Sequence, residues 1–162
     1  MAAPRSSFGT LAGYKLLGNH FLSNDRSLCL LKEYAGSKIL LLCLGIYAVV
    51  VNPLMEELFW RGVVLNYLDR SKIGSKKFAV AWSSSGYAAL HYPIFRLVLF
   101  SPWAEILTAG HVLYGVLLCW IYRRSGSIVT TAVTHGLLTD TAFIVVCLEL
   151  FRHHPEFLNK LP

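Results

Sequence analysis

A pair of glutamates opens the chemically informative part of this sequence. Glu56 and Glu57 are followed by Arg61 within an otherwise apolar stretch. In a helix, Glu57 and Arg61 share a face and can form an ion pair, because they are four residues apart. Glu56 lies about a hundred degrees around the helix from Glu57, so it faces elsewhere. A carboxylate left without that partner in an apolar environment is a candidate general base.

Two histidines occur in later apolar segments, each at helical spacing from a second polar residue. His91 follows Tyr87 by four residues, and Thr139 follows His135 by four. A single histidine in a helix is more often a hydrogen-bonded core residue than a catalyst. Two histidines on separate segments, with an unpaired glutamate on a third, favour a site, since an imidazole near Glu56 can share a water molecule with it.

Other polar residues in these segments have structural interpretations. We predict that Glu57 and Arg61 are a structural ion pair, and a salt-bridge cluster that only holds helices together remains an alternative for the whole glutamate motif. His111 has no polar residue four positions further on, which favours a helix-packing hydrogen bond. Asp140 is about 140° from His135 around an α-helix, so we expect it on a different face.

The elements that must carry these residues are apolar. Hydrophobic types make up 55% of the 162 residues, charged types 15%, and the mean hydropathy is +0.52. A soluble domain has about a quarter charged residues, whereas residues 39–51 here contain none. Ionisable residues within membrane spans are costly and are usually paired and functional. The composition therefore predicts an all-α, polytopic transmembrane helix bundle in which the glutamates and histidines meet as one polar cluster.

The net charge of +6 comes from basic residues at the ends of apolar segments. This placement is typical of cytoplasmic loops under the positive-inside rule. No basic face or base-stacking motif accompanies the charge, so we expect no nucleic-acid partner. The four cysteines are too widely spaced for a metal knuckle or a disulfide framework. The basic residues in question are Arg70, Lys72, Lys76, Lys77, Arg123 and Arg124.

We expect about four spanning segments after an N-terminal interfacial helix. Residues 1–37 are predicted to form that interfacial segment, residues 38–151 the membrane-embedded core, and residues 152–162 a polar tail. Within the core, residues 76–92 are expected to form a helix that Pro93 ends.

One feature of the first apolar segment leaves two topologies open. Asn52-Pro53 interrupts it, and a proline disfavours helix at the preceding residue. Either one long kinked helix continues through this point, or two helices meet there. The first alternative places Lys38 and Arg70 on opposite sides of the membrane, and the second places them on the same side.

Three motifs occur in order along successive segments. Their order and spacing resemble the CPBP family of glutamic-type intramembrane proteases, which includes the CAAX prenyl endopeptidases and bacterial homologues in bacteriocin processing and protein sorting. The resemblance covers roughly residues 40–150. The matching residues are Glu56, Glu57 and Arg61 for E-E-x-x-x-R, Tyr87 and His91 for F/Y-x-x-x-H, and His135 for the start of H-x-x-x-N/D.

The resemblance implies a mechanism and site residues. Glu56 and His91 would activate a water that attacks the scissile amide, and His135 with the residue four positions later would stabilise the oxyanion. That last position is Thr139, where the family has asparagine, and its hydroxyl is shorter than a carboxamide. The resemblance therefore predicts an intramembrane endopeptidase, with a catalytically inactive CPBP-like scaffold, chaperone or immunity-type protein as the alternative.

The resemblance also implies a site without a cofactor. The alternative is a divalent metal held by Glu56, His91 and His135 as a 2-His-1-carboxylate set. The expected partners are membrane lipid, a peptide or protein substrate with a membrane-associated segment, and a partner subunit that completes the short bundle. We expect a multi-pass integral protein of a bacterial inner membrane or an organellar membrane.

Overall fold

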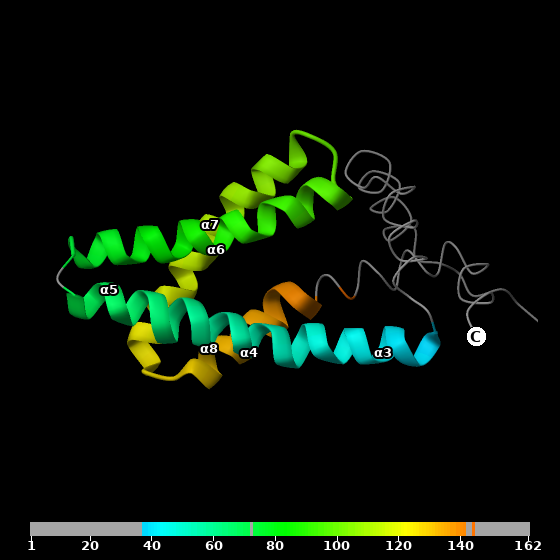
Figure 1. Ribbon diagram of the computed structural model, residues 1–162, viewed down its shortest axis with the longest axis horizontal. Helices are drawn as coiled ribbons and strands as arrows, with labels where there is room; N and C mark the ends of the chain where they lie inside the picture. Colours follow the sequence, from blue (N-terminus) through cyan, green and yellow to red (C-terminus); the bar gives the residue numbers. More distant parts are fainter. Residues whose placement is uncertain (1–36, 72, 142–143, 145–162) are drawn as a thin grey trace, which may run out of the picture.

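Helices form almost all of the computed structural model in the part of the chain that it describes, residues 37–71, 73–141 and 144 (Figure 1). No strand occurs within these ranges, and the all-α prediction is confirmed. Apart from Ser37, the predicted interfacial segment 1–37 lies outside the described residues, as does the predicted tail 152–162.

The glutamate motif lies on one long helical run that extends along the structure (Figure 1). Ser37 caps its start, because its side chain accepts a hydrogen bond from the backbone of Leu40 at 3.1 Å. The run passes through Asn52-Pro53, so the alternative with one continuous helix is the observed one; π-helical segments lie on both sides of this point. The segments are α3 (Lys38–Ile46), η1 (Tyr47–Val51), α4 (Asn52–Glu57), η2 (Leu58–Leu65) and α5 (Asn66–Ser71), with η denoting π-helix.

Three further helices follow and pack against this run. Ser75 and Ser127 begin two of them, because each side chain accepts a hydrogen bond from the backbone N–H three residues later. Gly126 ends another in the left-handed conformation, with φ 65°. The helices are α6 (Lys76–Val98), α7 (Trp103–Ser125) and α8 (Ile128–His135), and α8 continues into the π-helix η3 (Gly136–Asp140).

The prediction for α6 was wrong at its C-terminal end. We expected a helix over residues 76–92 ended by Pro93, but the helix continues to Val98. A proline removes one backbone donor, and apolar membrane helices tolerate this loss because neighbouring groups and local adjustments compensate for it. The helix ends at Val98, because the backbone of the next residue, Leu99, is extended (φ −113°, ψ 150°).

Gly115 and Gly136 allow close approaches between helices. A Cβ at Gly115 in α7 would lie 2.9 Å from the Cβ of Ser84 in α6. A Cβ at Gly136 in η3 would lie 2.6 Å from the carbonyl oxygen of Val49 in η1. Small residues have this role in many membrane helix pairs. These contacts hold α7 and η3 against the helices that carry the first two motifs.

Two of the described helices are long and apolar enough to cross a membrane, Ile39–Ser71 and Trp103–Ser125. Large apolar side chains on both are exposed, as Ile39 (75%) and Leu113 (74%) illustrate. Such surfaces suit lipid rather than water. The other two predicted spans, which begin near residues 76 and 128, remain predictions, and the second of them extends outside the described residues.

Candidate active site

Glu57 and Arg61 form a buried ion pair at the centre of the polar cluster. Arg61 Nη1 donates to Glu57 Oε1 at 2.8 Å, and both side chains are 0% exposed. Arg61 Nη2 donates to the carbonyl of Gly115 at 3.1 Å, and the guanidinium lies 4.9 Å from the centre of the Tyr87 ring. Buried charges require such compensation. The ion pair therefore links η2 to both α6 and α7.

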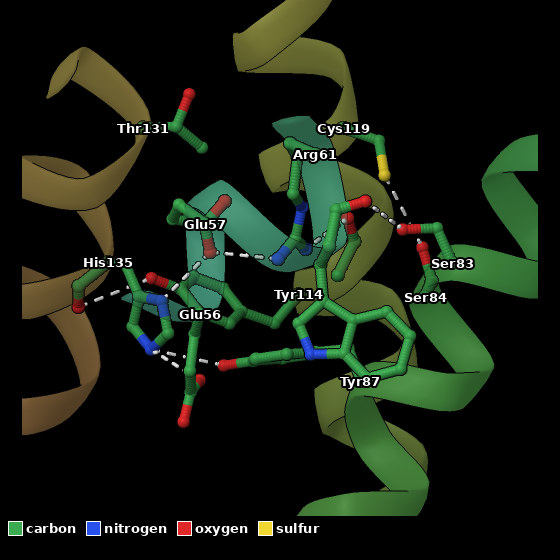
Figure 2. A network of polar contacts seen from close by, with 12 residues as sticks. Glu56, Glu57, Arg61, Ser83, Ser84, Tyr87, Tyr114, Cys119, Thr131 and His135 are labelled. Atoms are coloured by element: carbon green, nitrogen blue, oxygen red, sulfur yellow. Dashed lines mark hydrogen bonds and ion pairs between the residues drawn. The ribbon is translucent and has the colours of Figure 1, made fainter. Parts of the chain in front are cut away.

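His135 joins the same network from α8. Its Nδ1 lies 2.9 Å from Glu57 Oε1, and its Nε2 lies 3.2 Å from the hydroxyl of Tyr87 (Figure 2). Because a carboxylate only accepts hydrogen bonds, Nδ1 carries a hydrogen, and this contact fixes the orientation of the ring. Helical spacing predicts no partner for Glu57 except Arg61. The missed contact joins residues distant in sequence, so helical spacing gave no signal for it.

Glu56 occupies the more open part of the cluster. Its Oε1 accepts a hydrogen bond from Asn52 Nδ2 at 3.0 Å, one helical turn earlier. Its Oε2 lies 3.7 Å from His91 Nε2 and 3.8 Å from His135 Nε2. These separations exceed hydrogen-bonding distance, so the three atoms are not bonded to one another and can each contact a water that lies beside them. The structure thus brings Glu56, His91 and His135 together, and it adds Asn52, whose sequence position next to Pro53 predicts only a kink.

The protonation pattern of His91 follows from its neighbours. Its Nδ1 lies 2.9 Å from the carbonyl oxygen of Tyr87, which only accepts hydrogen bonds. Nδ1 therefore carries a hydrogen, and Nε2 of the neutral ring is left as an acceptor facing Glu56. The side chain of His91 is 17% exposed and that of Glu56 is 24% exposed, so both are accessible to small molecules.

The last turn of the described chain departs from expectation. Thr139 Oγ1 donates to the carbonyl of His135 at 2.9 Å. Asp140, expected on a different helix face, has its Oδ2 only 4.0 Å from His135 Nε2. The expectation was wrong because residues 136–140 form a π-helix rather than an α-helix. A π-helical turn contains more residues than an α-helical turn, so the fifth residue after His135 returns to its face.

His111 lies beside the cluster within a group of aromatic rings. Its ring centre is 5.1 Å from that of His91 and 4.6 Å from that of Phe95. Its Nδ1 lies 3.1 Å from the carbonyl of Leu107 on the same helix. The hydrogen bond of His111 is thus within its own helix, unlike the predicted helix-packing bond, and its ring lies next to that of His91.

The spacing of the acidic and histidine side chains bears on the metal alternative. Within residues 37–71 and 73–141, no group of three His, Cys, Asp or Glu side chains is arranged to hold a metal ion. The alternative in which Glu56, His91 and His135 bind a divalent cation therefore gains no support from their geometry. The same residues remain available for acid–base chemistry and hydrogen bonding.

Together, the helices and this cluster define an all-α membrane protein with a glutamate–histidine centre. The sequence model of a family described as type II CAAX prenyl endopeptidase Rce1-like matches residues 38–139. The chain belongs to this family of CAAX-type intramembrane proteases. Comparisons with curated proteins and with solved structures gave no significant match. The family match includes all three motifs and ends at Thr139, one residue before Asp140.

Proposed function

We propose that this chain is an active endopeptidase that hydrolyses a peptide bond of a membrane-associated substrate with water activated by Glu56 and His91. One observation carries the proposal: Glu56 Oε2 lies within 3.8 Å of the Nε2 atoms of both His91 and His135. A carboxylate and two imidazoles at this spacing can all contact one water placed beside them, on the accessible side of the cluster. Catalytic hydrogen bonds are often long before substrate binds.

The activating step uses Glu56 as the general base. Its carboxylate takes a proton from water, and the resulting hydroxide adds to the carbonyl carbon of the scissile amide. His91 Nε2 accepts a hydrogen bond from the second hydrogen of the same water and thereby orients the water toward the scissile carbonyl carbon. When the C–N bond breaks, Glu56 returns its proton to the leaving nitrogen. The reaction is balanced without a covalent intermediate.

His135 stabilises the negative charge that develops on the carbonyl oxygen. Its Nδ1–H donates to Glu57 Oε1. When the ring is protonated on both nitrogens, Nε2–H donates to the oxyanion. The Glu57 carboxylate supports that imidazolium, as a carboxylate does for histidine in hydrolytic triads. Arg61 in turn holds Glu57 in place at 2.8 Å. Glu57 and Arg61 are thus positioning residues in this mechanism.

The proposed substrate follows from the family and the surroundings of the site. The family description names CAAX prenyl endopeptidases, and a prenyl chain attaches its peptide to the membrane. A multi-pass bundle immersed in lipid can receive such a peptide laterally. We therefore propose a peptide with a membrane-associated segment as the substrate and membrane lipid as a partner. A partner subunit that completes the bundle remains a prediction.

The competing function is an inactive scaffold, chaperone or immunity-type protein. Thr139 favours it, because a threonine stands where the family has asparagine. A scaffold would need the buried Glu57–Arg61 pair for stability but would have no need for Glu56. Substitution of Glu56 therefore separates the two functions.

The test is cleavage of a farnesylated peptide ending in a CAAX sequence by the full-length chain in liposomes. We expect cleavage by the wild type, and a reduction of kcat by about 10²–10⁴-fold in Glu56→Gln. Glu105→Gln is the matched control, because Glu105 is an exposed acid that pairs with Arg96 at 3.2 Å. Circular dichroism checks that each variant is folded. Equal rates for Glu56→Gln and wild type, or no cleavage by wild type, would contradict the proposal.

A further inference from the structure

The last residue of the third motif differs according to whether it is chosen by sequence spacing or by distance to His135. Sequence spacing selects Thr139 as its last residue, since Thr139 is four positions after His135. The three-dimensional distances select Asp140 instead. Its Oδ2 lies 4.0 Å from His135 Nε2, next to Glu56 Oε2 at 3.8 Å from the same nitrogen. Two carboxyl groups therefore converge on the ring atom that faces the substrate in the proposed mechanism.

The hydroxyl of Thr139 is already engaged. It donates to the carbonyl oxygen of His135 at 2.9 Å, within its own helix. Its single hydrogen is therefore directed at the backbone rather than at a substrate. Thr134 makes the same type of bond to the carbonyl of Thr130 at 2.9 Å. Thr139 thus has the hydrogen bond of an ordinary helical threonine, and its hydroxyl also contacts the Tyr114 side chain from α7.

The carboxyl group of Asp140, unlike the Thr139 hydroxyl, has an oxygen that is not hydrogen-bonded within the described residues. Its side chain is 18% exposed, yet Oδ2 is buried and has no hydrogen-bond partner in the part of the chain that the structure describes. A buried polar atom without a partner is destabilising, and a catalytic role is one explanation for such an atom in a native protein. Glu57 Oε2 is in the same state, but Asp140 Oδ2 is the one that lies within 4.0 Å of His135 Nε2. A substrate oxygen or a bound water would satisfy it.

We propose that Asp140, and not Thr139, is the last catalytic residue of the third motif, and that its carboxyl group donates a hydrogen bond to the oxyanion beside His135. This inference rests on the proposed function. The π-helix Gly136–Asp140 causes this placement. In an α-helix the fourth residue after His135 lies on its face, whereas in a π-helix the fifth residue, Asp140, does. The donor is the proton-carrying form of the carboxyl group, and two carboxyl groups around one site commonly share a proton in this way.

The activity test compares four variants with the wild type on the farnesylated CAAX peptide. Asp140→Ala removes the donor and should lower kcat by about 10²–10³-fold with little change in KM. Asp140→Asn should stay within about tenfold of wild type, because a carboxamide donates from a similar position. Thr139→Val should resemble Thr134→Val, its matched control. Loss of activity in Thr139→Val to the level of Asp140→Ala, or equal loss in Asp140→Asn and Asp140→Ala, would overturn the inference.

A spectroscopic test separates this inference from the proposed function, because it needs no turnover. The ¹⁵N signals of the His135 imidazole are recorded by NMR for the full chain in detergent micelles and assigned with His135→Gln. Asp140→Ala should shift the Nε2 signal of His135, whereas Thr139→Val should leave it near its wild-type position. An unchanged His135 signal in Asp140→Ala would overturn the placement of Asp140. If the wild type cleaves no peptide but Asp140→Ala still shifts the His135 signal, only the proposed function is contradicted.

Discussion

The polar cluster has two halves that differ in how tightly their charged groups are held. In the buried half, Glu57 Oε1 lies 2.8 Å from Arg61 and 2.9 Å from His135 Nδ1, and all three side chains are at most 1% exposed. In the open half, Glu56 and Asp140 approach the histidine Nε2 atoms at 3.7–4.0 Å. Glu56 Oε2 and Asp140 Oδ2 have no hydrogen-bond partner within the described residues, and in the buried half the same holds for Glu57 Oε2 and Arg61 Nε.

This difference separates groups that hold the structure from groups that have room to react. Direct bonds in a dry environment fix geometry, because breaking one leaves an uncompensated charge. Separations of 3.7–4.0 Å leave these atoms without a direct hydrogen bond to each other, so each can bond to a water or substrate atom beside the cluster. His135 belongs to both halves: Nδ1 is fixed by Glu57, and Nε2 faces Glu56. The buried half can therefore orient the ring that the open half uses.

The largest effect on stability is expected from a substitution that breaks the ion pair of the buried half. Arg61→Met keeps the length of the side chain but leaves Glu57 buried without its cation, so we expect a loss of about 3–5 kcal/mol in the free energy of unfolding. Denaturant unfolding of the full chain in micelles measures it. Arg123→Met is the control, because Arg123 pairs with Asp69 at a part-exposed site and should change stability by about 1 kcal/mol or less. Equal effects of the two substitutions would contradict the distinction.

A smaller effect is expected from disturbing the contact that brings α7 to the buried half. Gly115→Ala introduces a Cβ about 3 Å from Ser84, and such overpacking should lower the free energy of unfolding by about 1–3 kcal/mol. Gly110→Ala is the matched control on the same helix, because nothing lies within 4 Å of its added Cβ. We expect no destabilisation there, since alanine favours helix. Thermal unfolding of both variants in micelles checks the difference; a stable Gly115→Ala would count against it.

The smallest effect is expected from a substitution that changes only the open half and lowers the cleavage rate. Asn52→Ala removes the amide that holds Glu56 Oε1 at 3.0 Å. Loss of one hydrogen bond worth about 1.4 kcal/mol should lower kcat about tenfold. Asn66→Ala is the control: its amide bonds Gly62 and Tyr122, outside the cluster, so the cleavage rate per folded molecule should not change. If Asn66→Ala reduced that rate as much as Asn52→Ala, the effect would not be specific to Glu56.

Helical spacing and composition predict a large part of this organisation. The all-α class follows from uncharged apolar segments, and the three ordered motifs identify the family that the sequence match shows. The pair Glu57 and Arg61 is predictable because four-residue spacing is a local property of a helix. These inferences hold wherever the geometry repeats regularly along the chain.

The remaining features depend on contacts or irregularities that local spacing does not encode. The bond between Glu57 and His135 depends on how α8 packs on α4. The placement of Asp140 depends on a π-helix, which the assumption of α-helical spacing excludes. The continuation of α6 past Pro93 shows the same limit, since tertiary surroundings in an apolar helix compensate for a lost backbone bond.

The most direct test of the division between the two halves is the cleavage rate per folded molecule in Glu56→Gln. The rate is measured on the farnesylated CAAX peptide in liposomes and divided by the folded fraction from the same sample. The account predicts a folded fraction equal to wild type and a rate about 10²–10⁴-fold lower. A folded Glu56→Gln that cleaves the peptide at the wild-type rate would contradict it.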